Sequence, residues 1–327
     1  MSTATAEGPA TTAGPEGAAG KPSKKKFKEP TGFFTFEFAL MAPALAFLAL
    51  LSIVPLVMLI AMSFSKVRTL GGVRLTPNGV DNWAAVLSDA SIWASWGRTL
   101  VYFVALIVLE MALGFAFAVV LNRLIRLRSV MLSIVLLPMF LAPVIVGLLG
   151  RFMLDGTIGL YAQMLSAVGL PVDLFAKPST ALPTIIMIDV WEWTPLIALI
   201  MLAGLTSVPP STLEAASVDG AGYFRTLFTI MVPQMKGVML VALLVRSMDA
   251  VRFYDIITAT TNGGPADSTK IIPLKLYELA FRFNDQIGRA AVVGIMMLIF
   301  SNIIATLFVK LFADKEPTHA KLEGPGQ

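Results

Sequence analysis

Six long apolar stretches divide the sequence and constrain its fold more than any other feature. They run over residues 38–64, 99–121, 130–152, 182–205, 237–257 and 287–312. A bilayer core about 30 Å thick needs about 20 apolar helical residues to span it, so each stretch is long enough for one transmembrane helix. With 56% hydrophobic and 14% charged residues, the chain has too few polar side chains to cover a soluble globule. We therefore predict an all-α, polytopic membrane protein with six transmembrane helices.

The residue types on which many enzymes depend are scarce in this chain. It has no cysteine, and its one histidine, His319, lies close to the C-terminal end. Disulfides, thiolate metal sites, histidine zinc sites and histidine-dependent triads are therefore excluded. The nearest match to a nucleotide-binding P-loop, at Gly20 and Lys21, has proline at the first glycine position and at the final Ser/Thr position. We predict that the chain is not an enzyme, does not hydrolyse ATP and holds no metal or cofactor of its own.

Positive charges indicate how the predicted helices are oriented. The net charge is +4, but the basic residues lie at the ends of apolar stretches instead of along one face, which argues against nucleic-acid binding. Lysines cluster at residues 21–28, and the short turn between the second and third stretches holds Arg123, Arg126 and Arg128 without an acid. Since Lys and Arg near helix ends are retained in the cytoplasm, we predict that both termini are cytoplasmic.

The polar ends of the chain contrast with its apolar middle. Residues 1–32 are rich in Ala, Gly, Thr and Pro and lack a helical apolar period, which is typical of a disordered tail. Residues 314–327 are a second polar tail. We therefore predict two cytoplasmic tails around one transmembrane domain at 33–313. Long polar connections at 206–236 and 258–286 are where function is expected.

The connection at 206–236 has a local structure that its residues predict. Ser211 and Glu214 have the spacing of a capping box, which predicts the start of a short helix. Gly220 is suited to end that helix with a positive φ. A second short helix then has an apolar stripe formed by Phe224, Leu227, Phe228 and Met231. These features alone fit either a structural connection or a functional segment.

The same connection resembles the EAA loop of permease subunits in binding-protein-dependent ABC importers. The matching residues, at the usual spacing, are Glu214, Ala215, Ala216, Asp219, Gly220, Ala221, Phe228, Ile230 and Pro233. Val232 stands where the family commonly has leucine, and Lys236 and Gly237 stand where a second proline often follows. Further parts of the chain resemble one branch of the family, the permeases for maltose, glycerol phosphate and other carbohydrates. These parts are Trp191 and the segments 155–159, 261–265, 277–281 and 288–291.

The resemblance implies a fold, a function and a set of partners. The fold would be the six-helix MetI-like permease fold, in the plasma membrane of a bacterium or archaeon. The EAA loop would dock into a separate ATPase subunit, which binds ATP and Mg, and would couple its closure to the transmembrane helices. A dimer of that ATPase, a second homologous permease and an extracytoplasmic solute-binding protein would complete an importer for a sugar or sugar-like solute, surrounded by membrane lipid.

Charged residues inside the predicted helices suggest where a solute passes. Such residues are costly in a membrane, so they usually face the protein interior or water. Asp189, Glu192 and Trp193 share one helical face of the fourth stretch, and Trp191 lies beside it. Carboxylates suit sugar hydroxyls and indole rings suit sugar CH faces, so these four residues are candidates for the solute pathway. The alternative is that neighbouring helices hold the two carboxylates.

Other polar residues of the apolar stretches are interpreted as structural. Arg246 and Asp249, three residues apart, predict an ion pair within the fifth stretch, while Glu110 and Asn302 predict hydrogen bonds between helices. The main alternative for the whole chain is a secondary transporter of a small polar solute, although its two halves show no convincing internal repeat. An intramembrane enzyme and a membrane scaffold without transport activity are further alternatives.

Overall fold

The computed structural model describes residues 36–69, 71–124, 127–169, 173–283 and 285–312 of the chain. The predicted tails at 1–32 and 314–327 lie outside these residues. The chain divides into two compact units, Met1–Val54 and Pro55–Gln327. The described part of the first unit is the beginning of helix α1 (Phe36–Ser63), and the elements that follow α1 belong to the second unit.

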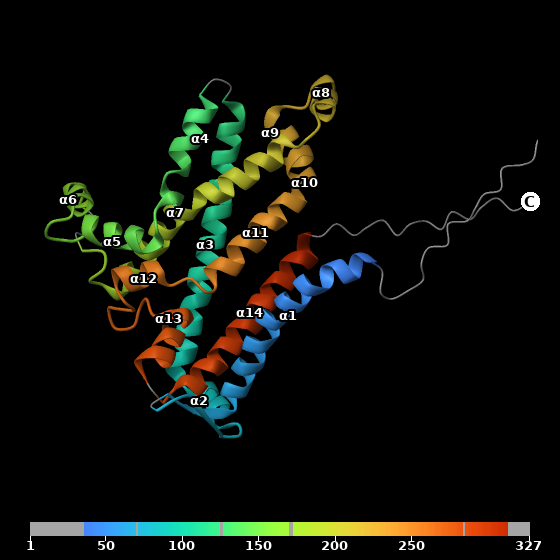
Figure 1. Cartoon of the computed structure of the whole chain (residues 1–327). Helices are drawn as coiled ribbons and strands as arrows, with labels where there is room; N and C mark the ends of the chain where they lie inside the picture. The colour runs from blue at the N-terminus through green and yellow to red at the C-terminus, as the bar shows by residue number, and fades with distance from the viewer. Residues whose placement is uncertain (1–35, 70, 125–126, 170–172, 284, 313–327) are drawn as a thin grey trace, which may run out of the picture. The chain divides into compact units, whose positions relative to one another are not determined.

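Helices account for most of the described residues, as Figure 1 shows. The strands among them form one antiparallel hairpin, β1 (Ser65–Arg68) and β2 (Arg74–Pro77), in which Ser65 lies opposite Pro77. The longer helices after α1 are α3 (Ala90–Arg123), α7 (Pro178–Thr206), α11 (Lys236–Ala250) and α14 (Ile287–Phe312). The shorter ones are α2 (Asp81–Ser88), α4 (Arg128–Leu136), the 3₁₀ helix η1 (Pro138–Phe140), α5 (Pro143–Met153), α6 (Leu160–Ala167), α8 (Pro210–Val218), α9 (Tyr223–Thr226), the π-helix η2 (Leu227–Met231), α10 (Val232–Gln234), α12 (Asp255–Thr260), α13 (Ile272–Tyr277) and the π-helix η3 (Glu278–Arg282).

Four helices of the described chain are long and apolar enough to cross a membrane: α1 from Leu40 onward, α3, α7 and α14. The number rises to five if Tyr223–Gln234 and Lys236–Ala250, which are bent by 68° relative to each other, form one span. These helices correspond to the predicted spans at 38–64, 99–121, 182–205, 237–257 and 287–312. The helix of the predicted fifth span ends at Ala250, earlier than expected.

The predicted third span at 130–152 is wrong as a single continuous helix. The chain forms α4, η1 and α5 there, and each piece is too short to cross a bilayer by itself. Proline is the cause. Ala142 is extended, with φ −70° and ψ 136°, because the ring of Pro143 disfavours the helical conformation of the residue before it. Pro138 opens η1, and it has no N–H with which to continue the hydrogen bonds of α4.

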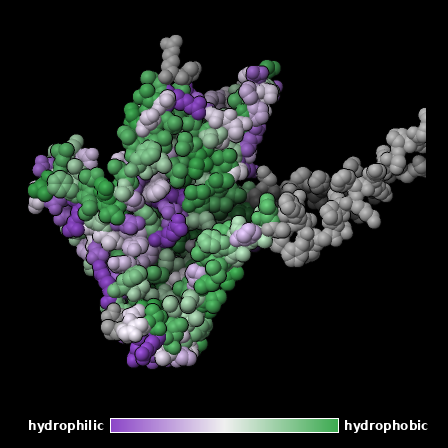
Figure 2. Space-filling model, in the orientation of Figure 1, coloured by the Kyte–Doolittle hydropathy of each residue, from purple (hydrophilic) through white to green (hydrophobic). Residues whose placement is uncertain are grey.

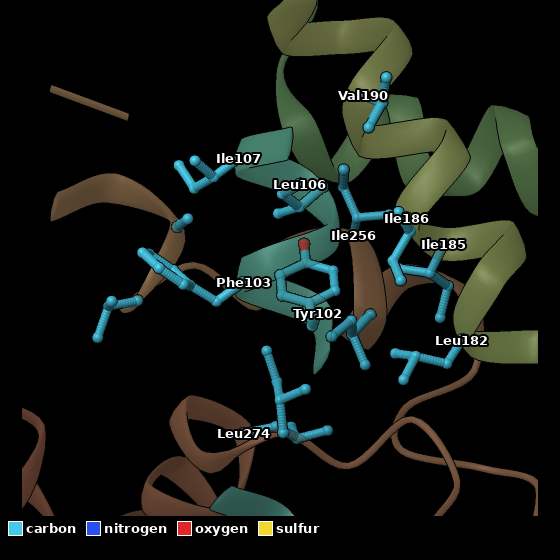
Figure 3. Packing of buried hydrophobic residues seen from close by; sticks show 14 of the residues in the cluster. Tyr102, Phe103, Leu106, Ile107, Leu182, Ile185, Ile186, Val190, Ile256 and Leu274 are labelled. Atoms are coloured by element: carbon cyan, nitrogen blue, oxygen red, sulfur yellow. The ribbon is translucent and has the colours of Figure 1, made fainter. Parts of the chain in front are cut away.

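The core of the second unit lies mainly between α3 and α7. Figure 3 shows Tyr102 and Leu106 of α3 on the side that faces Ile185 of α7, and all three side chains are fully buried. Further along, Gly114 allows the two helices to approach closely, since a Cβ there would lie only 2.6 Å from Cγ2 of Ile197. Such close packing makes α3 and α7 a firm frame for the polar residues that they carry.

Apolar side chains also cover much of the exposed surface of the helices. Figure 2 shows hydrophobic residues spread over the helices visible in that view. Leu100, Phe117 and Ile145, for example, are 52%, 44% and 49% exposed. A contiguous apolar surface of this kind is rare on a soluble protein. These faces therefore fit contact with lipid or with another membrane protein.

Candidate functional site

A buried arginine joins three helices. Arg246 on α11 is 1% exposed, and its Nε and Nη2 donate hydrogen bonds of 2.6 and 2.8 Å to the carboxylate of Glu110 on α3. Its Nη1 donates a hydrogen bond of 2.9 Å to Asp249, one turn further along α11. Nη2 also donates to Asp189 on α7, which accepts another hydrogen bond from the hydroxyl of Tyr102. We call these five residues the charged centre.

The charged centre contains more acid than base. Three carboxylates surround one guanidinium, and the side chains of Arg246, Glu110 and Asp189 are at most 1% exposed. Desolvated charges are costly unless they are paired and hydrogen-bonded, and removal of one partner leaves the others uncompensated. The predicted pair of Arg246 with Asp249 is confirmed, as is the predicted role of Glu110 in a contact between helices. The centre thus ties α3, α7 and α11 together.

The pathway residues predicted on α7 lie in different environments. Asp189 is engaged in the charged centre. Glu192 is 1% exposed, but its Oε2 has no hydrogen-bond partner among the described residues, and neither has Nε1 of Trp193. The ring of Trp193 packs edge-on against Phe253, with centroids 6.3 Å apart, and the guanidinium carbon of Arg246 lies 5.2 Å from the centroid of the same ring. Glu192 and Trp193 thus offer an acceptor and a donor next to the charged centre.

Trp191 lies on another face of α7. It is 53% exposed and lines a pocket of about 740 Å³ together with Tyr161 of α6 and with Met187 and Thr184, which precede it by about one and two helical turns. The pocket is mainly apolar, and the hydroxyl of Thr184 already donates a hydrogen bond of 2.8 Å to the carbonyl of Thr180. This pocket therefore offers little hydrogen bonding to a polyhydroxylated solute.

The predicted functional connection at 206–236, which we call the coupling segment, consists of short helical pieces. Helix α8 carries Glu214, Ala215 and Ala216; the first two are exposed, whereas Ala216 is 5% exposed. Asp219 is exposed and is the C-cap residue of α8, Phe228 lies in η2, and Pro233 lies in the first turn of α10. Figure 1 shows α8 beyond the end of α7.

Gly220 ends α8 in the predicted manner. It has a φ of +70°, in the left-handed region that favours glycine. Its N–H donates a hydrogen bond of 3.1 Å to the carbonyl of Ser217, and the N–H of Ala221 donates one of 2.9 Å to the carbonyl of Ala216. This pair of bonds is the Schellman motif, which satisfies carbonyls at the helix end and turns the chain away. The predicted glycine turn is therefore confirmed.

The predicted capping box is wrong. Helix α8 begins at Pro210, with Pro209 as its N-cap, and no side-chain hydrogen bond caps it in the described part of the chain. Proline is favoured at the first helical position because its fixed φ suits a helix and its missing N–H would have no partner there anyway. Ser211 consequently lies inside the first turn. Glu214 is left exposed on the surface of α8, where a partner can reach it.

The predicted apolar stripe of the second short helix is only half buried. Leu227 and Met231 are 2% and 4% exposed, whereas Phe224 and Phe228 are 70% and 58% exposed. The residues of η2 form a π-helix, and its i→i+5 hydrogen bonds change the rotation per residue from that of an α-helix. The four side chains therefore do not share one face, and two aromatic rings remain on the surface.

The buried half of this stripe attaches the coupling segment to the long helices. Leu227, Met231 and Met235 belong to one buried apolar cluster with Leu121 near the end of α3 and Met201 near the end of α7. Burial of a side chain of this size stabilises the packing by about 1.5–3 kcal/mol. The inner half of the coupling segment is thus held firmly, while α8 is mostly exposed.

One member of the charged centre, Tyr102, was not predictable from the sequence. Tyr102 is a tyrosine in an apolar stretch, and nothing in its neighbourhood along the chain indicates that its hydroxyl meets Asp189.

The expected role of Asn302 in a contact between helices is wrong, since its Nδ2 donates a hydrogen bond of 2.9 Å to the carbonyl of Leu298 in its own helix. An exposed amide can satisfy itself in this way without a neighbouring helix.

Comparisons of the sequence with known proteins all indicate the same protein family. Residues 110–316 match the protein family described as "Binding-protein-dependent transport system inner membrane component". The trehalose/maltose transport system permease protein MalF of Thermococcus litoralis is 35% identical over 235 residues, which cover 72% of this chain and 80% of that protein. The trehalose transport system permease protein SugA of Mycobacterium tuberculosis is 30% identical over 288 residues, which cover 86% of this chain and 89% of that protein.

The fold is also similar to that of a solved structure. A chain from the crystal structure of a bacterial alginate ABC transporter, in complex with an alginate pentasaccharide-bound periplasmic protein, matches with a TM-score of 0.72. The match covers 84% of this chain and 93% of that chain. The two sequences are 21% identical, so this likeness concerns the fold alone.

Proposed function

Since this chain belongs to the family of inner membrane components of binding-protein-dependent transport systems, we propose that it is the permease of an importer for a sugar or sugar-like solute. It is a multi-pass inner membrane subunit that catalyses no reaction itself, and ATP is bound by a partner ATPase subunit. Relatives named for trehalose and maltose transport support a sugar as the solute. The family also decides against the alternative of a secondary transporter.

A six-span topology is part of this proposal. The broken region α4–η1–α5 is the third span, and the bent pair that contains α11 is the fifth. Both termini lie in the cytoplasm, with tails at 1–32 and 314–327 around a transmembrane domain at 33–313. The positive charges of the turn after α3 support this orientation, because Lys and Arg are retained on the cytoplasmic side.

The proposed partners are those of an ABC importer. A second, homologous permease would contribute the other half of the pathway, and a dimer of ATPase subunits would bind ATP and Mg on the cytoplasmic side. An extracytoplasmic binding protein would deliver the solute. The alginate transporter was crystallised with a periplasmic protein, which supports an assembly of this kind. The exposed apolar faces of the helices suit a second permease as well as lipid.

The coupling segment is the proposed contact with the ATPase. The observation that carries this assignment is the exposed helix α8, ended by the positive-φ turn at Gly220, inside the region of the family match. Ala215 gives α8 a slim exposed surface that can enter a cleft, and Glu214 offers a carboxylate to a cation of the partner. Leu227 and Met231 attach the inner half of the segment to the ends of the long helices, so α8 is held next to them.

Glu192 and Trp193 are the proposed solute contacts of the pathway. Buried polar atoms are nearly always hydrogen-bonded, so Oε2 of Glu192 and Nε1 of Trp193 point to a partner such as water or a sugar hydroxyl. The indole ring also provides an apolar face for the CH groups of a sugar. Asp189 is assigned to holding Arg246, and Trp191 to the apolar pocket on the other face of α7.

Reconstitution tests the proposed function. The chain is purified under mild conditions from its native membrane, its co-purifying proteins are identified, and the complex is placed in liposomes with labelled trehalose or maltose outside. We expect an ATPase and a second permease to co-purify, and uptake to require both ATP and the binding protein. Uptake by the isolated chain, driven by an ion gradient without ATP, would overturn the proposal.

A further inference from the structure

Helix α11 connects the coupling segment to the charged centre. It begins at Lys236, directly after α10, and the helical pieces before and after this junction are bent by 68°. Arg246 lies ten residues further along α11, about 15 Å away along the helix axis at 1.5 Å per residue. A displacement of the coupling segment therefore enters α11 at one end and reaches Arg246 through a continuous helix.

Arg246 differs from the other buried residues of α11 in the kind of contact it makes. Ala242 and Leu243 pack in apolar clusters, and apolar contacts have no preferred direction, so they tolerate sliding of one helix along another. A guanidinium that holds a carboxylate through two charge-assisted hydrogen bonds has a defined geometry. Within the described residues, Arg246 makes the only ion pairs that join α11 to α3 and to α7, with Glu110 and Asp189.

The same guanidinium lies beside a proposed solute contact. Its carbon is 5.2 Å from the ring centroid of Trp193, and the same ring packs edge-on against Phe253, which follows the end of α11. The indole ring, which belongs to α7, therefore contacts Arg246 of α11 and Phe253, three residues after the end of α11. A shift of α11 must change either the position of this ring or its contact with Arg246.

We propose that Arg246 is the positioning residue that transmits movement of the coupling segment to Glu192 and Trp193 in the solute pathway. The inference rests on the proposed function, because it needs an ATPase that moves α8. When the ATPase closes, α11 moves as a rigid body. The ion pairs of Arg246 with Glu110 and Asp189 then make α3 and α7 move with it. Without these pairs, α11 slides along its neighbours and the pathway stays as it was.

A cysteine reporter tests this link without knowledge of the solute. The chain contains no cysteine, so Leu196→Cys, one turn from Glu192 and Trp193 on α7, gives a single site for a small polar thiol reagent. The labelling rate is measured in the reconstituted complex with and without ATP and Mg. In the otherwise unchanged chain we expect ATP to alter this rate. An unaltered rate there would overturn the proposed function, and with it this inference.

A conservative variant, with a matched control, then tests Arg246 itself. Arg246→Lys keeps the charge but cannot hold Glu110 bidentately, and we expect it to reduce the ATP-dependent change in labelling roughly fivefold or more, with basal ATP hydrolysis and assembly nearly unchanged. Arg252→Gln is the matched control: this exposed arginine lies 3.8 Å from Asp249 but makes no ion pair to α3 or α7 within the described residues, so the variant should behave like the parent chain.

Folding is separated from coupling by a neutral triple variant. Glu110→Gln, Asp189→Asn and Arg246→Gln together keep hydrogen-bonding groups in the charged centre but leave no unpaired charge among these three. We expect this variant to assemble and to lose the ATP-dependent change in labelling. Retention of the full change in either Arg246 variant would overturn the inference. Failure of both variants to assemble would also overturn it, because Arg246 would then serve folding alone.

Discussion

Arg123 lies over the ring of Tyr223, with its guanidinium carbon 3.5 Å from the ring centroid. Arg123 ends α3, and Tyr223 begins α9 in the coupling segment. A cation above an aromatic face is attracted by the negative face of the ring, so the contact is favourable. It also places the end of α3 beside the start of α9, as expected if the turn after α3 and the coupling segment share the proposed cytoplasmic side.

This contact allows one labelling experiment to orient both segments. Single cysteines are introduced as Ser129→Cys, at a position that follows the turn after α3, and as Ser88→Cys, at the end of α2. Both positions are exposed, and the change from serine to cysteine is small. In intact cells, an impermeant thiol reagent is expected to label only Ser88→Cys, because the arginines hold the turn in the cytoplasm. Permeabilised cells, in which both should react, are the control. Labelling of Ser129→Cys in intact cells would reverse the proposed orientation.

Gly220 and Gly222 form a matched pair for testing the turn after α8. A Cβ at either position has no described atom within 4 Å, but φ is +70° at Gly220 and −67° at Gly222, the N-cap of α9. Gly220→Ser should destabilise the turn by about 1 kcal/mol because side chains disfavour the left-handed region. Gly222→Ser should be neutral or slightly favourable, since serine is a good N-cap.

The readout for this pair is ATP hydrolysis stimulated by the loaded binding protein. We expect a several-fold loss in Gly220→Ser and none in Gly222→Ser, with equal amounts of both proteins in the membrane. Equal activity of the two variants would mean that the conformation of this turn does not matter for coupling. An equal loss in both would instead indicate that the added side chain obstructs the partner.

Alanine variants of Glu214 and Ser211 distinguish a role of Glu214 in docking from a role in capping α8. Because α8 has no side-chain cap, Glu214→Ala and Ser211→Ala should each change the free energy of unfolding by no more than about 0.5 kcal/mol. Glu214→Ala should nevertheless weaken the stimulated hydrolysis, as it removes an exposed carboxylate from the docking surface. Thermal unfolding and ATPase assays on the two variants check this, and a matching loss of hydrolysis in Ser211→Ala would contradict it.

The fold could be predicted from sequence wherever local signals agree. The spans that became α1, α3, α7 and α14 are continuous apolar stretches, and length with composition suffices to find them. The broken helix of the predicted third span could not be foreseen, because Pro138 and Pro143 interrupt a stretch whose hydropathy is uniform. Hydropathy reports burial in lipid, whereas the helix break depends on a backbone N–H and on the φ and ψ angles before a proline.

The site shows the same division between local and long-range information. The turn at Gly220 depends on neighbours in the sequence, and it was predicted correctly. The pair of Arg246 with Asp249 is also local, at a spacing of three residues. The contacts of Arg246 with Glu110 and Asp189 join three helices, and no pattern in one sequence says which carboxylate meets which cation.

The pair of Lys270 with Asp267 predicts a dependence of stability on pH. Nζ of Lys270 lies 2.7 Å from Oδ1 of Asp267 and 3.3 Å from Oε2 of Glu278. The hydrogen bond from Lys270 holds the pKa of Asp267 below its usual value. Burial lowers the pKa of Lys270, but the hydrogen bonds and charges of the two acids outweigh burial and leave that pKa raised.

The sign of both shifts favours the folded state at neutral pH. The contribution of Asp267 is present above its ordinary pKa of about 3.9 and is lost as the pH falls through its lower folded value; that of Lys270 is lost as the pH rises above about 10.4. Asp267→Asn suits the same backbone, with φ 58°, but removes the charge. We expect it to lower stability by no more than about 1 kcal/mol at pH 7, since Asp267 is 61% exposed, and the effect should shrink as the pH falls through the lowered pKa of folded Asp267. Thermal unfolding across this range measures the difference, and a constant difference at all pH values would contradict the electrostatic origin.

Trp193 and Trp191 distinguish a solute pathway from packing on α7. Both are tryptophans of one helix, but Trp193 packs against Phe253 beside the charged centre, whereas Trp191 is half exposed at the apolar pocket. If the solute passes Trp193, Trp193→Ala should lower trehalose uptake by at least about tenfold, because stacking of the sugar on the indole ring and a hydrogen bond from Nε1 together contribute more than about 1.4 kcal/mol. Trp191→Ala should leave uptake within about twofold, since its loss affects an apolar surface outside the proposed pathway.

Two further measurements decide how a loss in Trp193→Ala is interpreted. Trp193 is half-buried, so truncation of its ring also removes packing against Phe253. In a fully buried core such a truncation costs about 3–5 kcal/mol of stability, and a loss of this kind can disrupt assembly. Basal ATP hydrolysis and the yield of the assembled complex are therefore measured in parallel. A second variant, Trp193→Phe, keeps most of the ring but lacks the Nε1 donor. A pathway role predicts normal assembly with reduced uptake in both variants. Normal uptake in Trp193→Phe together with a lost complex in Trp193→Ala would show that the ring serves packing, and the solute contact would then have to be sought at Glu192 alone.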